Sequence, residues 1–217
     1  MKKTYLVLGG VDDELSLPAN GIKVGVDYGA FRLASLGQKF DYAIGDFDSV
    51  TPNELLEIAH YARQMIFLPH QKDVTDTEAA VEYLTNRGFD MFEIHDALGG
   101  RIDHTIANIR LMQRLSQRSL KIVLYGKKQK LTVLSPGVHT LRREQWPFKY
   151  VSFFACTEEV KSLTISNLLY EVEGQDLKRE DIYAISNEWV EGKIARLSFD
   201  EGNLLVINDE DEGGESR

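Results

Sequence analysis

Two aspartates lie two positions apart in the stretch "AIGDFDSVTP", between an apolar run and a helix start. Neither Asp46 nor Asp48 is needed to cap that helix. The following "TPNE" makes Thr51 the cap, with Pro52 at the first helical position and Glu54 completing a capping box. Two like charges on a short loop repel each other unless a cation lies between them, and Mg²⁺ prefers carboxylate oxygens. The pair therefore predicts a magnesium site.

A second acidic segment, "HQKDVTDTE", follows another apolar run. In "TDTE", Thr75 is the expected helix cap and Glu78 its reciprocal partner. Asp73 is then available for another role. Asp76 falls in the first helical turn, where it either faces a ligand or only stabilises the helix dipole.

The stretch "GGRIDH", residues 99–104, indicates a site for anions. Gly99 and Gly100 let a ligand approach the backbone closely, and the N-terminus of the following helix attracts anions. Arg101 offers a planar fork that suits phosphate, although a plain turn with a surface arginine is the alternative. His104 either contacts phosphate or is a neutral histidine in the first turn. The phosphate loop GxxxxGK[ST] and the dinucleotide fingerprint GxGxxG are both absent.

The elements that must position these residues are short apolar runs that alternate with helical patterns up to about residue 126. Strands are expected at residues 4–9, 22–26, 40–44, 64–68, 91–98 and 120–126, and helices at 51–62, 75–88 and 103–116. Such alternation predicts a mostly parallel sheet with right-handed crossovers. Ligands bind beyond the carboxyl ends of the strands in such sheets. Successive strand ends would therefore bring one set of acids to the same rim: Asp27, Asp46, Asp48, Asp73, Asp76 and Asp103.

The pattern of apolar residues changes after "GKKQK", residues 126–130. From there on, short runs in which apolar and polar residues alternate are separated by residues typical of turns. Strands are expected at residues 130–135, 150–156, 161–166, 181–186, 193–199 and 203–208. This spacing predicts an antiparallel sandwich or barrel. We therefore expect an α/β domain over residues 1–127, an antiparallel β-sandwich domain over 128–209, and an acidic tail over 210–217.

The composition limits the classes of function. Of the 217 residues, 43% are hydrophobic and 27% are charged, as in ordinary globular proteins. The formal charge of −9 opposes nucleic acid or an anionic membrane as the main partner, and it suits a metal or a cationic ligand. The apolar run after "MKK" ends too soon for a signal peptide, and no segment has the length of a membrane span, so we expect a cytoplasmic protein.

Four motifs together resemble those of the thiamine pyrophosphokinase family. They are "GDFDS", "DVTDTE", "GGRIDH" and "SNEW" at residues 186–189, and they occur in the order of that family. The resemblance covers nearly the whole chain, including the change from α/β to all-β. It implies an enzyme that transfers a pyrophosphoryl group from ATP to the hydroxyethyl oxygen of thiamine, needs Mg²⁺ and releases AMP.

The resemblance also implies roles for individual residues. Asp46, Asp48 and Asp73 would hold magnesium, while Asp76 would lie beside the phosphates and Asp27 would match the aspartate of an early acidic-glycine motif. The nucleotide site would include Gly99, Gly100, Arg101, Asp103 and His104, and thiamine would contact Ser186, Asn187 and Trp189. The early motif here reads "DYGA", with Tyr28 where the family commonly has glycine. The family's homodimer, with sites shared between subunits, is expected here too.

Two other functions compete with this one. A pyrophosphokinase for another heterocyclic alcohol, such as a hydroxymethyl pterin, would use the same metal and nucleotide motifs. A non-catalytic protein that senses nucleotide or thiamine would bind metal without turnover. An aromatic face beside an acidic rim favours the thiazolium cation of thiamine, which a neutral pterin does not require. Trp189 is that aromatic residue, unless it is part of the core.

Overall fold

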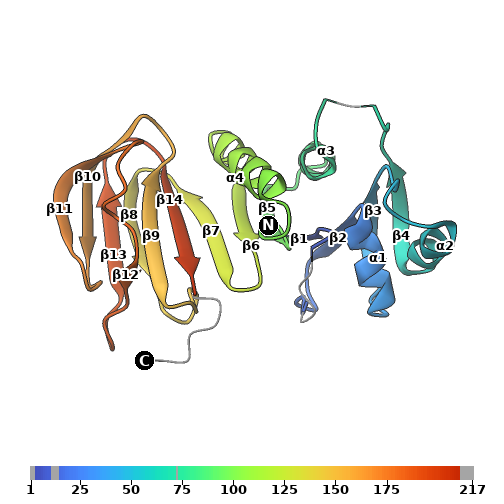
Figure 1. Ribbon diagram of the computed structural model, residues 1–217, viewed down its shortest axis with the longest axis horizontal. Helices are drawn as coiled ribbons and strands as arrows, with labels where there is room; N and C mark the ends of the chain where they lie inside the picture. Colours follow the sequence, from blue (N-terminus) through green and yellow to red (C-terminus); the bar gives the residue numbers. More distant parts are fainter. Residues whose placement is uncertain (1–2, 11–14, 72, 211–217) are drawn as a thin grey trace. The chain divides into compact units, whose positions relative to one another are not determined.

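The structure is a computed structural model that describes residues 3–10, 15–71 and 73–210. The chain divides between Lys127 and Lys128 into two compact units. The predicted fold class is confirmed, because an α/β unit precedes an antiparallel β-sandwich (Figure 1). Apart from Glu210, the predicted acidic tail over 210–217 lies outside the described residues.

The first unit is built on a parallel sheet of strand order β6-β5-β1-β2-β3-β4, in which each strand pairs in parallel with its neighbours. The strands are β1 (Thr4–Val7), β2 (Ile22–Val26), β3 (Phe40–Gly45), β4 (Ala62–Phe67), β5 (Met91–His95) and β6 (Lys121–Tyr125). All lie where apolar runs predicted them. The strand order reverses direction beside β1, which is where open parallel sheets form ligand-binding crevices.

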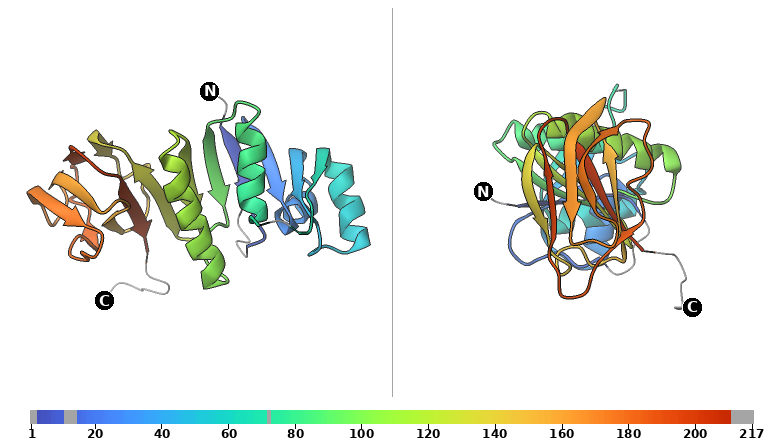
Figure 2. Two further views of the ribbon diagram at one scale, coloured as in Figure 1. Left: turned by 90° about the horizontal axis from the view of Figure 1, so that it is seen from above. Right: turned by 90° about the vertical axis from the view of Figure 1, so that its left-hand side faces the viewer.

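Helices cover both faces of this sheet. They are α1 (Tyr28–Ser35), α2 (Pro52–Tyr61), α3 (Asp76–Thr85) and α4 (Ile102–Ser116). Figures 1 and 2 show α3 and α4 on the face opposite α1. Leu33 of α1, Ile58 of α2 and Ala43 of β3 share one buried cluster, so α1 and α2 pack together. None of the helices in the described part of the chain has the length and apolar character that a membrane span needs.

The helix caps hold the loops that carry the acidic motifs. The capping box is present, since Glu54 N donates to Thr51 Oγ1 and Thr51 N donates to Glu54 Oε2 at 2.6 Å. Thr75 also caps α3, accepting a hydrogen bond from Glu78 N at 3.2 Å. The carboxylate of Glu78 is engaged elsewhere, 2.5 Å from Arg114 Nη2 on α4.

The second unit consists of two antiparallel sheets, β12-β9-β14-β7 and β11-β10-β13-β8. The strands are β7 (Gln129–Leu134), β8 (Gly137–Leu141), β9 (Tyr150–Ala155), β10 (Glu159–Ser166), β11 (Val172–Lys178), β12 (Asn187–Glu188), β13 (Ala195–Phe199) and β14 (Leu204–Asp209). Phe153 and Val206 of one sheet and Leu163 and Leu197 of the other belong to one buried core. That shared core defines a sandwich.

One predicted strand of the second unit is wrong. Residues 181–186 form no strand; Phe153 N donates to Ala184 O at 2.8 Å, and Ala184 is buried. Ile182 and Tyr183 remain 70% and 47% exposed. The alternation of apolar residues in this segment therefore does not follow an inward and an outward face.

Candidate active site

A cavity of about 460 Å³ lies at the carboxyl ends of β1, β2 and β5 in the first unit. Gly9 and Gly10 line it after β1, Asp27 and Tyr28 after β2, and residues 99–101 after β5. Asp76 and His104 also line the cavity, from the first turns of α3 and α4. The parallel sheet therefore gathers residues that are distant in the chain, as its topology predicted.

Asp27 lines this cavity in a strained backbone conformation. It is a non-glycine residue with φ 50° and ψ −122°, a combination that costs energy and occurs most often at functional sites. Ser49 Oγ donates to its Oδ2 at 2.7 Å, whereas its buried Oδ1 has no hydrogen-bond partner among the described residues. Burial raises the pKa of Asp27, and the charges of Asp76 and Asp46 raise it further. The hydrogen bond from Ser49 lowers this pKa but does not cancel the rise. Three of the predicted acids thus interact electrostatically.

We predict that Asp27→Asn makes the fold less sensitive to pH. A raised pKa means that the folded state binds the proton more tightly, so wild-type stability falls as the pH rises from the ordinary aspartate value through the raised one. Asparagine tolerates a positive φ and removes this loss. The melting temperature of Asp27→Asn should therefore exceed that of the wild type, and the difference should grow as the pH rises from the ordinary pKa of aspartate to the raised pKa of Asp27. Thermal melts in chelator, with the exposed Asp200→Asn as control, check this; a constant difference at every pH would contradict it.

The acidic loop after β3 is held by the residue between its two aspartates. Phe47 has φ 57° and a buried side chain, and its ring meets that of Phe67 edge-on at 5.3 Å. The left-handed backbone at Phe47 folds the loop back on itself, so that Asp48 N lies 3.4 Å from Asp46 Oδ1. Packing of one aromatic side chain therefore keeps the two carboxylates together.

A histidine joins these two acids. His70 Nδ1 lies 3.7 Å from Asp46 Oδ2, and one ligand atom from each of Asp46, Asp48 and His70 lies within 4.8 Å of the others. Among the described residues, this is the group that could hold a metal ion. His70 follows β4, which neighbours β3 in the sheet. Asp73 is exposed and lies outside the group.

The glycine motif forms the turn into α4. Gly99 and Gly100 have φ of 94° and 64°, which favour glycine at both positions. Thr105 Oγ1 accepts a hydrogen bond from Gly99 N at 3.2 Å and fixes the turn to the helix. The backbone before α4 is therefore set beside the cavity, where an anion would meet the helix N-terminus.

Arg101 is engaged by its neighbour in the sequence. Its Nε and Nη2 donate to Asp103 Oδ1 and Oδ2 at 3.2 and 2.6 Å, and this hydrogen bonding lowers the pKa of the Asp103 carboxyl. Both side chains are largely exposed. Asp103 itself does not line the cavity, whereas Arg101 and His104 do. The predicted phosphate fork therefore lies at the cavity and already binds a carboxylate.

If Arg101 binds the phosphates of ATP, as the resemblance implies, Arg101→Lys should lower catalytic efficiency by about 10-fold or more, because an ammonium group cannot reproduce a planar bidentate contact with phosphate. The substitution keeps the positive charge, so stability should change little. Initial rates over a range of ATP concentrations measure the effect, and Arg110→Lys on the exposed side of α4 is the control. Unchanged kinetics would favour the alternative that the sequence left open, in which Arg101 is only a surface residue of a plain turn.

The turn "SNEW" lies in the second unit, and its members differ in exposure. Ser186 is exposed, with φ 54°. Asn187 is buried, and its side chain accepts from Tyr170 N at 2.9 Å and donates to Tyr170 O at 2.7 Å. The Asn187 amide therefore fixes this turn to the backbone at Tyr170, while the side chain of Ser186 remains accessible.

Trp189 lines a second cavity, of about 550 Å³, on the sandwich. The indole is half-buried against the sandwich core, and its Nε1 donates to Phe148 O at 2.9 Å. The Arg143 guanidinium carbon lies 5.7 Å from the centre of the ring. A cation of the protein itself therefore lies over an aromatic face that was predicted to receive thiamine.

Comparison with known proteins assigns both units. A family model described as "Thiamin pyrophosphokinase, catalytic domain" matches residues 15–124, and one described as "Thiamin pyrophosphokinase, vitamin B1 binding domain" matches residues 138–204. The chain belongs to the thiamin pyrophosphokinase family. The family that the four motifs indicated is thereby confirmed.

Relatives within the thiamin pyrophosphokinase family resemble the whole chain. Thiamine pyrophosphokinase of Bacillus subtilis is 29% identical over 188 residues, which are 87% of each chain. The crystal structure of the Bacillus subtilis protein superposes with a TM-score of 0.87 at 27% identity, covering 97% of this chain and all of that one. A family protein from Enterococcus faecalis gives 0.86 at 28% identity over the same shares.

The site residues expected from the thiamin pyrophosphokinase motifs fall into distinct groups. Asp27, Asp76, Arg101 and His104 line the first cavity with both motif glycines, and Asp46 and Asp48 form the acidic pair. Sequence reasoning missed His70, which follows β4 as a lone histidine. The sequence feature that could have revealed His70 is its position directly after a predicted strand, at the rim of the sheet where the acids were expected.

Proposed function

We propose that this protein transfers a pyrophosphoryl group from ATP to thiamine. The observation that carries the proposal is the first cavity, which combines carboxylates with a glycine turn and a helix N-terminus in the segment that matches the catalytic family model. The hydroxyethyl oxygen of thiamine attacks the β-phosphorus of ATP. The bond from that phosphorus to the α–β bridging oxygen breaks, AMP leaves, and the hydroxyl proton is released. Thiamine diphosphate is the product.

The acidic pair fits a magnesium ion. Asp46 and Asp48 supply hard carboxylate oxygens within 4.8 Å of each other, a donor type that Mg²⁺ prefers. When bound, the ion neutralises charge on the phosphate oxygens. Asp73 remains the predicted third ligand, and its exposed position leaves it accessible to a nucleotide-bound ion.

Side chains of the first cavity would position the reactants. The turn at Gly99 and Gly100 and the start of α4 would bind phosphate oxygens through backbone N–H groups, with Arg101 as the cationic partner. Asp73 and Asp76 are the candidates for orienting or deprotonating the alcohol. Asp76 is favoured because it is half-buried and lines the cavity.

Formation of AMP from ATP only when thiamine is present tests this function. We expect stoichiometric AMP and thiamine diphosphate with thiamine and none with a hydroxymethyl pterin. AMP formation with the pterin alone would identify the other pyrophosphokinase. Tight binding of ATP and thiamine without AMP would identify a sensor. Chelation of divalent ions should stop the reaction if magnesium is required.

A homodimer with shared sites is the second part of the proposal. Large apolar side chains are exposed near the "SNEW" turn. Three precede it directly in the chain, and two belong to a segment hydrogen-bonded to it: Ile182, Tyr183 and Ile185, and Leu169 and Tyr170. Exposed apolar groups of this kind mark contact surfaces. We propose that this surface contacts a second copy of the chain and brings Ser186 and Trp189 to the partner's acidic rim. The expected cytoplasmic location stays a prediction.

Mixing two variants that are impaired in different units tests the shared site, at a thiamine concentration low enough to leave Trp189→Ala largely without thiamine. Asp48→Asn and Trp189→Ala, unfolded together and refolded, should form some mixed dimers that carry one intact site. Partial recovery of AMP formation is expected, and each variant refolded alone is the control. Full wild-type activity from a species that sedimentation shows to be a monomer would refute shared sites.

Trp189→Ala should weaken thiamine binding by about 2- to 30-fold, the loss of an aromatic face over a cation, and Trp189→Phe should keep part of the affinity. ATP affinity should remain unchanged. Trp146→Phe is a matched control, because Trp146 is buried in the same core with Lys130 over its ring. Separate thiamine and ATP titrations decide: equal losses for both ligands, with a large fall in melting temperature, would make Trp189 a core residue.

A further inference from the structure

Tyr28 stands where the family motif commonly has a glycine. The residue begins α1, is half-buried, and lines the first cavity. Its ring lies 5.5 Å from that of Phe31, one helical turn further along, at an angle of 58°. No hydrogen bond of the Tyr28 hydroxyl exists within the part of the chain that the structure describes. The ring is therefore held by packing, and its polar end is available.

Close approach of backbones at this corner depends on other residues. A Cβ on Gly29 would lie 1.9 Å from Val7 O, and a Cβ on Gly9 would lie 3.1 Å from Tyr28 Cβ. The tight contact between α1 and β1 thus needs Gly29, and Gly9 makes room for the tyrosine. Position 28 is free of that constraint, so its side chain can serve the cavity.

Tyr28 brings an aromatic ring to a cavity that also has an apolar wall. Leu8, Val26 and Ala97 contribute apolar surface, while the turn at 99–101 offers groups that suit phosphate. A nucleotide has the same combination, a flat aromatic base joined to phosphates. A neutral base can approach Asp27 and Asp76 without charge repulsion, and every base has a face that stacks on aromatic rings.

We propose that the ring of Tyr28 stacks on the base of the bound nucleotide and makes this chain's affinity depend on that base. The inference rests on the proposed function for the existence of a nucleotide site. The thiazolium cation of thiamine is the other flat ligand, but the segment that matches the vitamin B1 binding model is residues 138–204, in the other unit. The aromatic contact proposed for thiamine is Trp189 of that unit, which leaves the nucleobase as the flat group for the ring of Tyr28.

Paired titrations with magnesium ATP and magnesium tripolyphosphate test this proposal, because only ATP carries a base. Tyr28→Ala should weaken ATP binding by about 5- to 140-fold, the loss of one stacked base, and leave tripolyphosphate binding unchanged. Tyr28→Phe should retain most of the ATP affinity. Tyr28→Leu keeps apolar volume without an aromatic face and should lose ATP affinity even if the alanine variant folds poorly. Tyr83→Ala, on α3 outside the cavity, is the control.

Three results would overturn the proposal. Wild-type ATP affinity in both Tyr28→Ala and Tyr28→Leu would remove the stacking contact. Equal losses for ATP and tripolyphosphate would make Tyr28 a structural residue. Weaker thiamine binding with intact ATP binding would assign the ring to the acceptor. A wild-type protein that binds neither ATP nor tripolyphosphate would instead refute the proposed function, and this inference with it.

Discussion

Asp48→Asn is expected to lower the rate of thiamine-dependent AMP formation by at least about 100-fold while the protein stays folded. Losing a group that only supports a metal ligand already costs about 10- to 100-fold, and a direct ligand should cost at least as much. Asp46→Asn should have a similar effect. The two carboxylates lie on one tight loop beside Asp27, so removing a charge also relieves repulsion. The melting temperature without metal should therefore stay the same or rise slightly.

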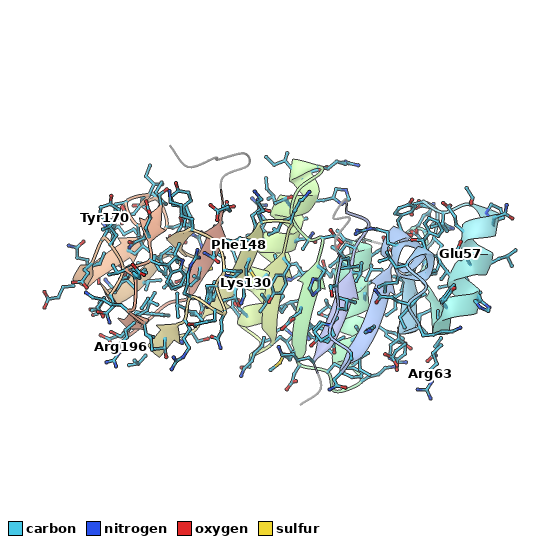
Figure 3. All side chains as sticks on the ribbon, turned by 90° about the horizontal axis from the view of Figure 1, so that it is seen from below. Glu57, Arg63, Lys130, Phe148, Tyr170 and Arg196 are labelled. Carbon is cyan, nitrogen blue, oxygen red and sulfur yellow. The ribbon has the colours of Figure 1, made fainter. Side chains whose placement is uncertain are left out.

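Initial rates at increasing magnesium concentrations, together with thermal melts in chelator, measure both effects. Glu57→Gln is the matched control, because Glu57 is an exposed acid on α2 (labelled in Figure 3). Full activity of both variants at saturating magnesium would contradict the assignment of Asp46 and Asp48 as metal ligands. A large fall in melting temperature would instead make the loop structural.

Gly29→Ala is expected to destabilise the first unit by about 3 kcal/mol or more, at the upper end of the range for overpacked cores. The added methyl group would lie 1.9 Å from Val7 O and 2.6 Å from Val7 C, atoms of a strand buried between neighbours on both sides. Neither backbone can yield cheaply, so α1 must move away from the sheet and expose Leu33. A fall in melting temperature of about 6 to 12 °C should accompany this loss.

Calorimetry or denaturant titration of Gly29→Ala measures the loss. Ser35→Ala, at the exposed end of the same helix, should stay within about 0.5 kcal/mol of the wild type. Because α1 starts at the first cavity, which is the proposed nucleotide site, the affinity of Gly29→Ala for ATP should fall as well. A wild-type melting temperature would show that the contact between α1 and β1 can relax.

The sequence allowed the general arrangement of the first unit to be predicted. Alternating strands and helices imply that the strand ends meet at one rim, and the interaction of Asp27 with Asp46 and Asp76 is the result. The left-handed backbone at Phe47 could not be predicted, because it depends on where a buried ring packs. Nor could the contact of His70 with Asp46, since a lone histidine has no spacing to interpret.

The second unit was harder to read from sequence. Alternation of apolar residues at 181–186 predicted a strand, but a strand also needs an available neighbour, and that depends on the whole sheet. The short strand at Asn187 and Glu188 has too few residues for a pattern. The cation over Trp189 comes from Arg143, far away in the chain, so local sequence could not reveal it.

The loop with His70 is anchored by β4, the edge strand of its sheet, which pairs with β3 alone among the described strands. Edge strands open more readily than central ones, because fewer hydrogen bonds hold them. A cation shared by Asp46, Asp48 and His70 would join the β3 loop to the β4 loop. Its binding would then oppose fraying of the edge by mass action. Amide hydrogen exchange along residues 62–67 should slow when the cation binds, so that part of the enzyme's stability would vary with the free metal concentration of its surroundings.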